Sequence, residues 1–248
     1  MANVTSVKVY KGVGIVSARR LGIPNALMRD LGDCEQLKIA HRSNSTAWKQ
    51  HRKPGGGNLA RLDNLEGVDL TVQMQEWLED NLAMVTQGGL VTLAEETVSG
   101  EEVLLMPGSL ARTEFPGAKS LVITQKAGST PIPLSEVEVS AAGVRVKAGS
   151  TLITAPTPAL LAYISTAATR LEALIEPGAE YEIVFDGLNE ADSGRPVVVT
   201  FWRWKAPPAE ELALIDAENP GKLLAKGEVL ADLSRPAGES PFYRVDLL

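Results

Sequence analysis

With 248 residues, 44% of them hydrophobic, the chain can bury a sizeable core, and we expect one domain spanning residues 1–248. Its 24 lysine and arginine residues against 31 acidic residues leave a net charge of −7, which disfavours general binding to nucleic-acid phosphates. The sequence contains no run of about 18 apolar residues and no charged head before an apolar block, so neither a membrane span nor a secretion signal is predicted.

The first 58 residues read as two strands followed by a loop. Apolar residues in 7–19 predict a strand that bends near its glycines, and 34–41 predicts a second strand. From 42 to 58 the sequence RSNSTAWKQHRKPGGGN has no periodicity and ends in three glycines. This composition predicts a long flexible loop at about 42–58.

A strict alternation marks the third strand, at 68–76. Its apolar positions are Val68, Leu70, Val72 and Met74, and the polar positions between them are Asp69, Thr71, Gln73 and Gln75. We therefore expect one buried and one wet face. In 77–87 the period changes to that of a helix, with acidic residues in the first turn and a glycine as the stop, so one short helix should flank the sheet.

The remaining pattern is that of many short strands separated by turns, as in a β-sandwich or barrel. Strands are expected at 90–94, 102–106, 120–125, 136–139, 144–147, 222–232 and 243–247, with a short turn or strand at 210–215. The local propensity of 158–176, which is rich in alanine and leucine, favours a helix. We nevertheless expect a strand there, because of the resemblance described below.

The stretch 181–205 reads YEIVFDGLNEADSGRPVVVTFWRWK. Two apolar, β-branched and aromatic runs flank a polar segment, which predicts a hairpin. In its second half, 195–205, both faces carry residues that can be buried against other parts of the protein, as in a central strand.

Candidate catalytic and metal-binding residues are few. His41 and His51, even with the single cysteine, Cys34, lack the spacing and the fourth donor of a zinc site, and one cysteine cannot form an internal disulfide. No Gly-x-Ser-x-Gly motif is present, and PGGGN lacks the lysine and hydroxyl of a phosphate loop. Adjacent carboxylates such as Glu95 and Glu96 point to opposite faces of a strand, which favours a solvated surface. The sequence thus predicts no enzyme, no metal site and no cofactor.

The order of the motifs along the chain resembles the tail tube proteins of long-tailed bacteriophages. The motifs are LGDCEQLKI, GVDLTVQMQEW, EDNLAMVTQG and EVEVSAAGVRV, then FDGLN, RPVVV and PPAEELALI, then GEVLADLSR. Together they cover nearly the whole chain, and their order is more specific than any one of them. The resemblance implies two packed antiparallel sheets, a β-sandwich or barrel, with one short flanking helix. It also implies a strand at 158–176 with Tyr163 near its start.

The function that the resemblance implies is structural. The chain would be the major subunit of a phage tail tube, a virion protein whose hexameric rings stack into a hollow conduit for DNA ejection. Implied partners are copies of itself, other tail proteins such as the tape measure and the tail terminator, and DNA that passes through the lumen without specific binding; no membrane is involved. The implied location is the virion tail, assembled in the bacterial host cytoplasm. The alternative is a monomeric β-sandwich carbohydrate-binding or adhesin module, with Trp202 and Trp204 as its platform.

Two groups of residues are candidates for the lumen and for ring closure. The solvent-exposed face of the third strand is formed by Asp69, Thr71, Gln73 and Gln75. It is neutral to acidic and is expected to be adjacent to no lysine, so we expect it to line the lumen, with an ordinary outer face as the alternative. Tryptophan is enriched at interface centres, so the aromatic run is expected either near the ring interface or in the core. Its members are Phe201, Trp202 and Trp204.

Segregated charge predicts how rings stack. Residues 36–62 contain basic but no acidic residues, and 63–111 contain acidic but no basic ones. The predicted ring-stacking loop carries Arg42, Trp48, Lys49, Arg52, Lys53 and Arg61. The acidic surface expected to receive it on the next ring is formed by Glu79, Asp80, Glu95, Glu96, Glu101 and Glu102. Opposite charges on two rings would steer them together; a solvated loop without such a role is the alternative.

Overall fold

The computed structural model describes residues 9–248, so the start of the strand expected at 7–19 lies outside the described residues. The chain forms two compact units. Unit 1 comprises the chain up to Leu90 and from Leu171 onward, and unit 2 is the segment Val91–Arg170 inserted into it. This division replaces the single domain that we expected. The composition of the chain does not reveal the insertion, because both units have the same alternation of short strands and turns.

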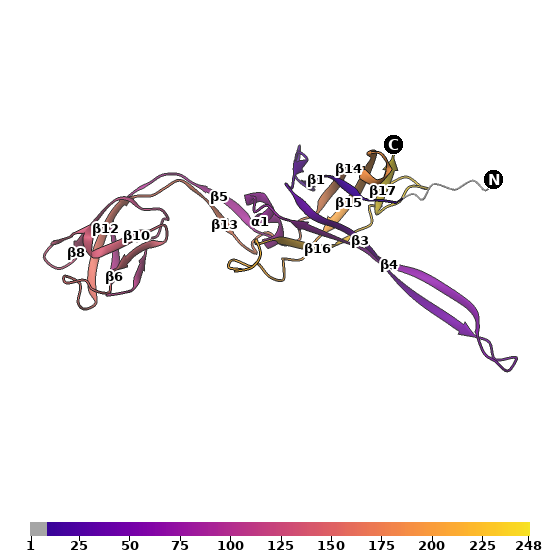
Figure 1. Ribbon diagram of the computed structural model, residues 1–248, viewed down its shortest axis with the longest axis horizontal. Helices are drawn as coiled ribbons and strands as arrows, with labels where there is room; N and C mark the ends of the chain where they lie inside the picture. Colours follow the sequence, from indigo (N-terminus) through magenta and orange to yellow (C-terminus); the bar gives the residue numbers. More distant parts are fainter. Residues whose placement is uncertain (1–8) are drawn as a thin grey trace. The chain divides into compact units, whose positions relative to one another are not determined.

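Unit 1 is built on an antiparallel sheet in the strand order β2-β1-β14-β15-β16-β4-β3 (Figure 1). Strand β15 carries two further strands along one edge, β17 opposite residues 197–201 and β16 opposite residues 204 and 205. The strands are β1 (Gly12–Arg20), β2 (Arg29–Asp30), β3 (Cys34–Lys49), β4 (Asn58–Met74), β14 (Tyr181–Asn189), β15 (Arg195–Lys205), β16 (Leu223–Val229) and β17 (Tyr243–Leu247), with a 3-10 turn, η2 (Glu190–Asp192), between β14 and β15.

The core of unit 1 contains the apolar faces of β1, β14 and β15 together with those of β4 and β16. The alternation expected in the third strand is confirmed in β4. Its apolar residues, Val68, Leu70, Val72 and Met74, are all buried. A mainly antiparallel β-fold with one short α-helix, as expected from the sequence, is therefore confirmed.

The flanking helix is confirmed as α1 (Glu79–Thr86). It ends at Gln87, which adopts the left-handed conformation, and its buried residues include Asn81 and Val85. The Asn81 side chain donates to the carbonyl oxygen of Leu31 over 2.8 Å and accepts from the guanidinium of Arg29 over 2.8 Å. These bonds satisfy a fully buried amide and tie the helix to the loop around β2.

Unit 2 contains a three-stranded sheet, β10-β11-β7, and a four-stranded sheet, β6-β12-β8-β9. Its strands are β6 (Thr97–Leu105), β7 (Leu110–Arg112), β8 (Lys119–Gln125), β9 (Pro131–Ile132), β10 (Val137–Ser140), β11 (Gly143–Val146) and β12 (Thr157–Ile164), with a 3-10 turn, η1 (Leu134–Glu136). Strands β5 (Gly89–Leu93) and β13 (Ala168–Glu172) pair where the chain enters and leaves the unit. Within the described residues, the two units have separate cores.

The strand expected within 158–176 is confirmed by β12 and β13, against the local helix propensity. Ala159, Leu161 and Tyr163 are buried at every second position of β12. This is the period of a strand, and burial of these side chains between the sheets of unit 2 outweighs the preference of alanine and leucine for a helix.

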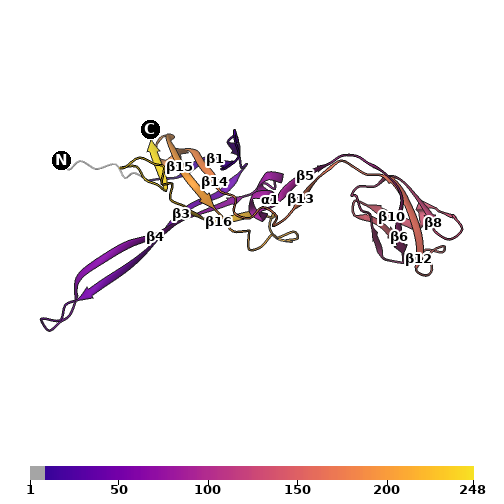
Figure 2. The ribbon, with the colours of Figure 1, turned by 180° about the vertical axis from the view of Figure 1, so that it is seen from behind.

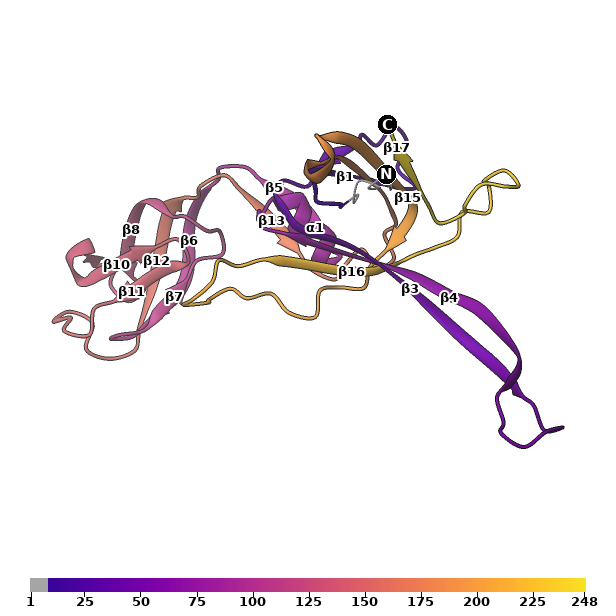
Figure 3. The ribbon, with the colours of Figure 1, turned by 45° about the vertical axis from the view of Figure 1, so that its right-hand side comes forward.

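The prediction of a long flexible loop at 42–58 is wrong. Strands β3 and β4 continue as a paired ribbon to Lys49 and Asn58, which leaves only residues 50–57 as a connecting turn. We call residues 43–65 the arm; Figures 2 and 3 show it extending from unit 1 as a two-stranded ribbon. Both faces of the arm are wet, so its sequence lacks the alternation that marks a half-buried strand.

Candidate assembly surfaces

The arm is amphipathic in an unusual sense, because one of its faces is uncharged. Residues directly opposite each other in an antiparallel pair share a face. Trp48 lies opposite Ala60, and Thr46 lies opposite Leu62, so these four side chains cover one face. Trp48 is 50% exposed and Leu62 is 49% exposed. We call this the apolar face of the arm.

The other face, which we call the polar face, carries Arg61 and Asp63 and also Leu65, which is 52% exposed. Ala47 lies opposite Arg61 and Ser45 opposite Asp63, and the Nε of Arg61 lies 2.7 Å from Oδ1 of Asp63. Strand β4 pairs with β16 only from Val68 onward, so in the described chain neither strand of the arm has a second neighbour. A lone two-stranded ribbon is at best marginally stable in water. The arm therefore has the properties of a segment that is stabilised by a partner.

The structure places the predicted ring-stacking residues in three settings. Lys49, Arg52 and Lys53 lie at or next to the turn of the arm, and we call them the tip cations. Arg61 lies on the polar face. Arg42 lies at the base, where its guanidinium contacts Asp69 over 2.8 Å and Glu228 over 3.0 Å. Arg42 is thus held by its own subunit rather than presented to another.

The acidic residues predicted to receive the arm are divided between the two units. Glu79 and Asp80 form the exposed first turn of α1 in unit 1. The other four lie in unit 2, where three of them already have partners; Glu95 lies 3.9 Å from Nζ of Lys119. Glu102 lies 2.6 Å from Nζ of Lys126, and Glu101 accepts a 2.6 Å hydrogen bond from the hydroxyl of Tyr163.

The wet face of β4 has mixed charge. Thr71 lies between Lys38 on β3 and Lys226 on β16, and Asp69 pairs with Arg42. Gln73 donates to Glu35 over 2.9 Å, and Gln75 is exposed just beyond the end of the strand. The expectation that no lysine adjoins this face is wrong, because lysines reach it from the two neighbouring strands. Whether the face lines a lumen stays a prediction.

Two of the three aromatic interface candidates are core residues. Phe201 and Trp204 are fully buried in unit 1. They lie three positions apart and yet share the core, because an irregularity in the β14–β15 register places an extra residue of β15 between them. Phe201 and Trp204 therefore take the core position that was the alternative to an interface role. The sugar platform loses Trp204 for the same reason.

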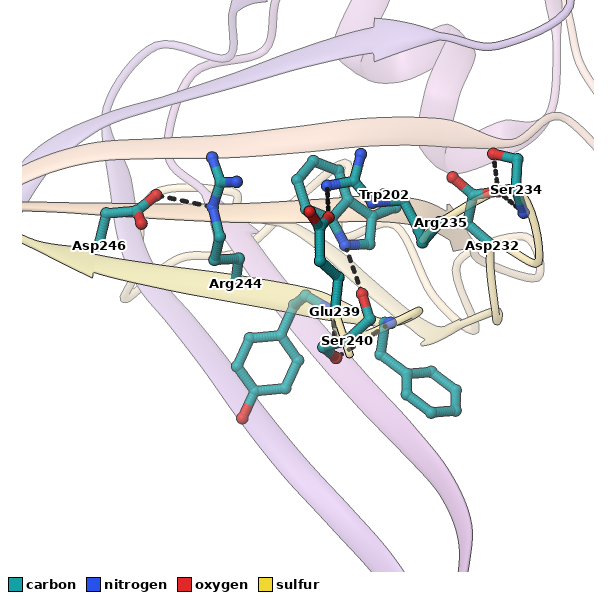
Figure 4. A network of polar contacts seen from close by, with 10 residues as sticks. Trp202, Asp232, Ser234, Arg235, Glu239, Ser240, Arg244 and Asp246 are labelled. Carbon is teal, nitrogen blue, oxygen red and sulfur yellow. Dashed lines mark hydrogen bonds and ion pairs between the residues drawn. The ribbon is translucent and has the colours of Figure 1, made fainter. Parts of the chain in front are cut away.

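Trp202 is half-buried. Figure 4 shows its ring beside Arg235. The guanidinium of Arg235 lies 3.8 Å from the centre of its ring, and that of Arg244 lies 5.5 Å away. Its Nε1 donates to the carbonyl oxygen of Ser240 over 3.1 Å. These contacts lie within one subunit and occupy the ring that a sugar would need.

A surface that the sequence reasoning missed is the segment 207–221 between β15 and β16, which we call the strap. It lies against the wet face of β4 and β16 and encloses with it a cavity of about 490 Å³, lined among others by Gln73 and Leu224. Leu214 and Ile215 of the strap are 79% and 95% exposed. The turn or strand expected at 210–215 is an irregular segment instead.

The strap is also acidic. It carries four carboxylates and no lysine or arginine: Glu210, Glu211, Asp216 and Glu218. Hydrogen bonds from the backbone N–H groups of Glu218 and Asn219 lower the pKa of Asp216. One end is held where the indole of Trp77 donates to the carbonyl oxygen of Gly221 over 2.9 Å. The run of carboxylates was visible in the sequence, but the adjacent cavity was not.

A second concave surface lies among β1, β14, β15 and β17 and the start of β3. It encloses about 470 Å³ and is lined mainly by valine, leucine and phenylalanine side chains. Gly14 and Gly187 lie directly opposite each other there, and a Cβ on Gly187 would lie 2.2 Å from the Phe185 ring. At its edge, Val245 is 46% exposed and Leu247 is 66% exposed. We call this surface the apolar groove.

Among residues 9–248, no group of three or more histidine, cysteine, aspartate or glutamate side chains is placed to hold a metal ion. Over the same range, no helix is long and apolar enough to cross a membrane. Burial, and to a smaller extent the nearby carboxylates, raises the pKa of the Cys34 thiol to about 11. The thiol is therefore a poor nucleophile at neutral pH.

Together the fold and these surfaces define an antiparallel β-protein with an inserted second unit and a projecting arm. A family model described as "Protein of unknown function UCP028589" matches residues 9–246. Because the match covers nearly the whole chain, the chain belongs to this family. No curated protein matches the chain.

Proposed function

We propose that the chain is a structural, non-enzymatic subunit that assembles with copies of itself, the major subunit of a phage tail tube. The observation that carries this proposal is the arm. It combines an exposed apolar face, open strand edges and tip cations on a ribbon that its own unit does not cover. Such a segment favours docking on another molecule over a free existence in water.

Free strand edges in the body of unit 1 further support the proposal. Among the described strands, β3 pairs only with β4, and β17 pairs only with β15. Both strands line the apolar groove. A ring of identical subunits needs two different surfaces that match, and strand edges beside an apolar surface can supply them. Rings that stack would then form the tube, in the virion tail, with DNA passing through its lumen.

The experiment is negative-stain microscopy of the purified full chain over a range of concentrations. We expect rings or rods. A matched variant in which Ser43–Leu65 is replaced by an Asn-Gly turn shortens the hairpin at its exposed end and leaves the core of unit 1 intact. We expect this variant to stay folded and to form no rods. Dispersed small particles from the wild-type chain at every concentration would contradict the proposal.

A further inference from the structure

We propose that the strap is the surface that receives the arm of a second copy: the tip cations meet the strap carboxylates, and the apolar face of the arm packs against Leu214 and Ile215. This inference rests on the proposed function, because it requires that copies of the chain assemble. It assigns a role to the strap and its cavity, and it names a different acceptor from the acidic residues expected at 79–102.

The contact cannot form within one subunit. Strand β4 runs from Asn58, next to the tip of the arm, to Met74, and Gln73 near its end lines the cavity under the strap. At about 3.3 Å per residue, a strand of this length separates the two sites by about 50 Å. Figure 3 shows the arm leaving from one end of β4 and β16 lying along the other. An arm can therefore reach only the strap of another copy.

The charges of the two surfaces are complementary. The segment 36–62 has no acidic residue, and the strap has no basic residue. Lys49, Arg52 and Lys53 at the tip thus face no competing carboxylate on their own turn. Glu210, Glu211 and Asp216 line the cavity together with Lys222 and Lys226, so carboxylates outnumber lysines there. Lys222 is already paired with Glu35, and a docked tip would bring its cations close to the strap carboxylates. Such pairs steer association and fix its orientation.

The apolar side chains match as well. Leu214 and Ile215 are neighbours on the strap and are among the most exposed large apolar residues of the described chain. Trp48 and Leu62 on the arm are each about half exposed. Joining these four side chains removes apolar area from water on both partners, which gives the contact a component that salt does not screen.

Because the arm and the strap lie at opposite ends of β4, the contact is head-to-tail. Each copy that docks its arm leaves its own strap free for the next copy. A contact between two different surfaces continues from copy to copy unless a rotation closes it. The arm and strap thus suit growth along one axis, as in the stacking of rings, whereas the edges of β3 and β17 suit closure of a ring.

The test reverses charge on the arm and then on the strap of the full chain. We expect R52E/K53E to reduce the assembled fraction about tenfold or more at low salt, as measured by sedimentation and microscopy. Adding E210K/E211K to the same chain should restore assembly. The matched control adds E95K/E96K instead, reverses two carboxylates of unit 2, and should not restore it.

Zero-length carbodiimide cross-linking of the wild-type assembly, with isotope-labelled and unlabelled copies mixed, gives a second measurement. We expect interchain links from Lys49 or Lys53 to Glu210, Glu211 or Asp216. Normal assembly by R52E/K53E, restoration by E95K/E96K, or interchain links that consistently miss the strap would each overturn the inference and leave the proposed tube standing. If neither E210K/E211K nor E95K/E96K restores assembly of R52E/K53E, the interchain cross-links decide whether the strap receives the arm. Failure of the wild-type chain to assemble would instead contradict the proposed function itself.

Discussion

The Nε1 of Trp204 donates a hydrogen bond to the carbonyl oxygen of Leu70 over 3.2 Å, in the core of unit 1. Because Trp204 is fully buried, W204A removes a large side chain and should lower the free energy of unfolding by about 3–5 kcal/mol. Urea unfolding measures this change. The matched substitution W202A removes a half-buried ring and should cost clearly less. Equal costs for the two variants would contradict the placement of Trp204.

Gly227 makes room for the Trp204 indole. A Cβ at this position would lie 2.7 Å from Nε1 of Trp204 and 2.4 Å from the carbonyl oxygen of Lys205. We expect G227A to destabilise the protein by about 1–3 kcal/mol, through displacement of backbone or indole. A Cβ added to Gly149 would have no other atom within 4 Å, so G149A serves as the control. A thermal melt of G227A that matches wild type would show that the site relaxes freely.

The Cys34 thiol should resist alkylation. Burial raises its pKa from 9.0 to about 11, so at pH 8 its thiolate is roughly a hundredfold scarcer than that of an unperturbed cysteine. Since the pKa is higher in the folded state, the protonated Cys34 thiol contributes its full share of folding stability below pH 9, and this share is lost as the pH rises toward 11. The rate of iodoacetamide labelling against pH measures this. A midpoint near 9 in the folded protein would contradict the burial of the thiol.

We expect that unit 2 can be deleted without unfolding unit 1. Where the chain leaves and re-enters unit 1, the backbone N–H of Leu174 donates to the carbonyl oxygen of Thr86 over 3.0 Å, so the two ends of the insertion lie close together. Replacing Val91–Arg170 with a short glycine-rich turn should leave unit 1 folded, because the two units have separate cores in the described chain. A cooperative thermal transition and antiparallel β circular dichroism check this. An unfolded product would show that unit 1 depends on the insertion.

The Tyr163 hydroxyl should stabilise unit 2 alone. It donates to Glu101 over 2.6 Å, and Y163F removes that bond to a charged group. We expect a loss of about 1.5–3 kcal/mol, seen by hydrogen exchange in Val91–Arg170 and not in unit 1. The control E102Q breaks only an exposed ion pair with Lys126 and should have a small effect. Equal changes in exchange across both units would contradict their independence.

Much of the fold was predictable wherever one face of a strand is buried. Val68, Leu70, Val72 and Met74 alternate because every second side chain of β4 enters the core. The same strand between Asn58 and Leu65 was not predictable, because both faces of the arm are wet and its residues follow no period. Pairing with β3, rather than burial, makes this segment a strand.

Of the proposed contact between arm and strap, the sequence predicted only the basic charge of the arm. The basic segment around Arg52 was visible in the sequence, and the structure places it at the tip of the arm. Its proposed acceptor was not found, because four carboxylates in 207–221 look like an ordinary polar loop until the cavity beside them is seen. The burial of Trp204 with Phe201 was missed because an extra residue in β15 breaks the alternation on which such a prediction depends.

The central claim is self-assembly of this chain, and sedimentation velocity of the purified protein tests it most directly. The subunit mass is 26.4 kDa, so a hexameric ring is expected near ~158 kDa, with larger particles appearing as rings stack at higher concentration. The variant lacking Ser43–Leu65 should form no particle larger than a ring. A single species of 26.4 kDa at every concentration and salt tested would contradict the account.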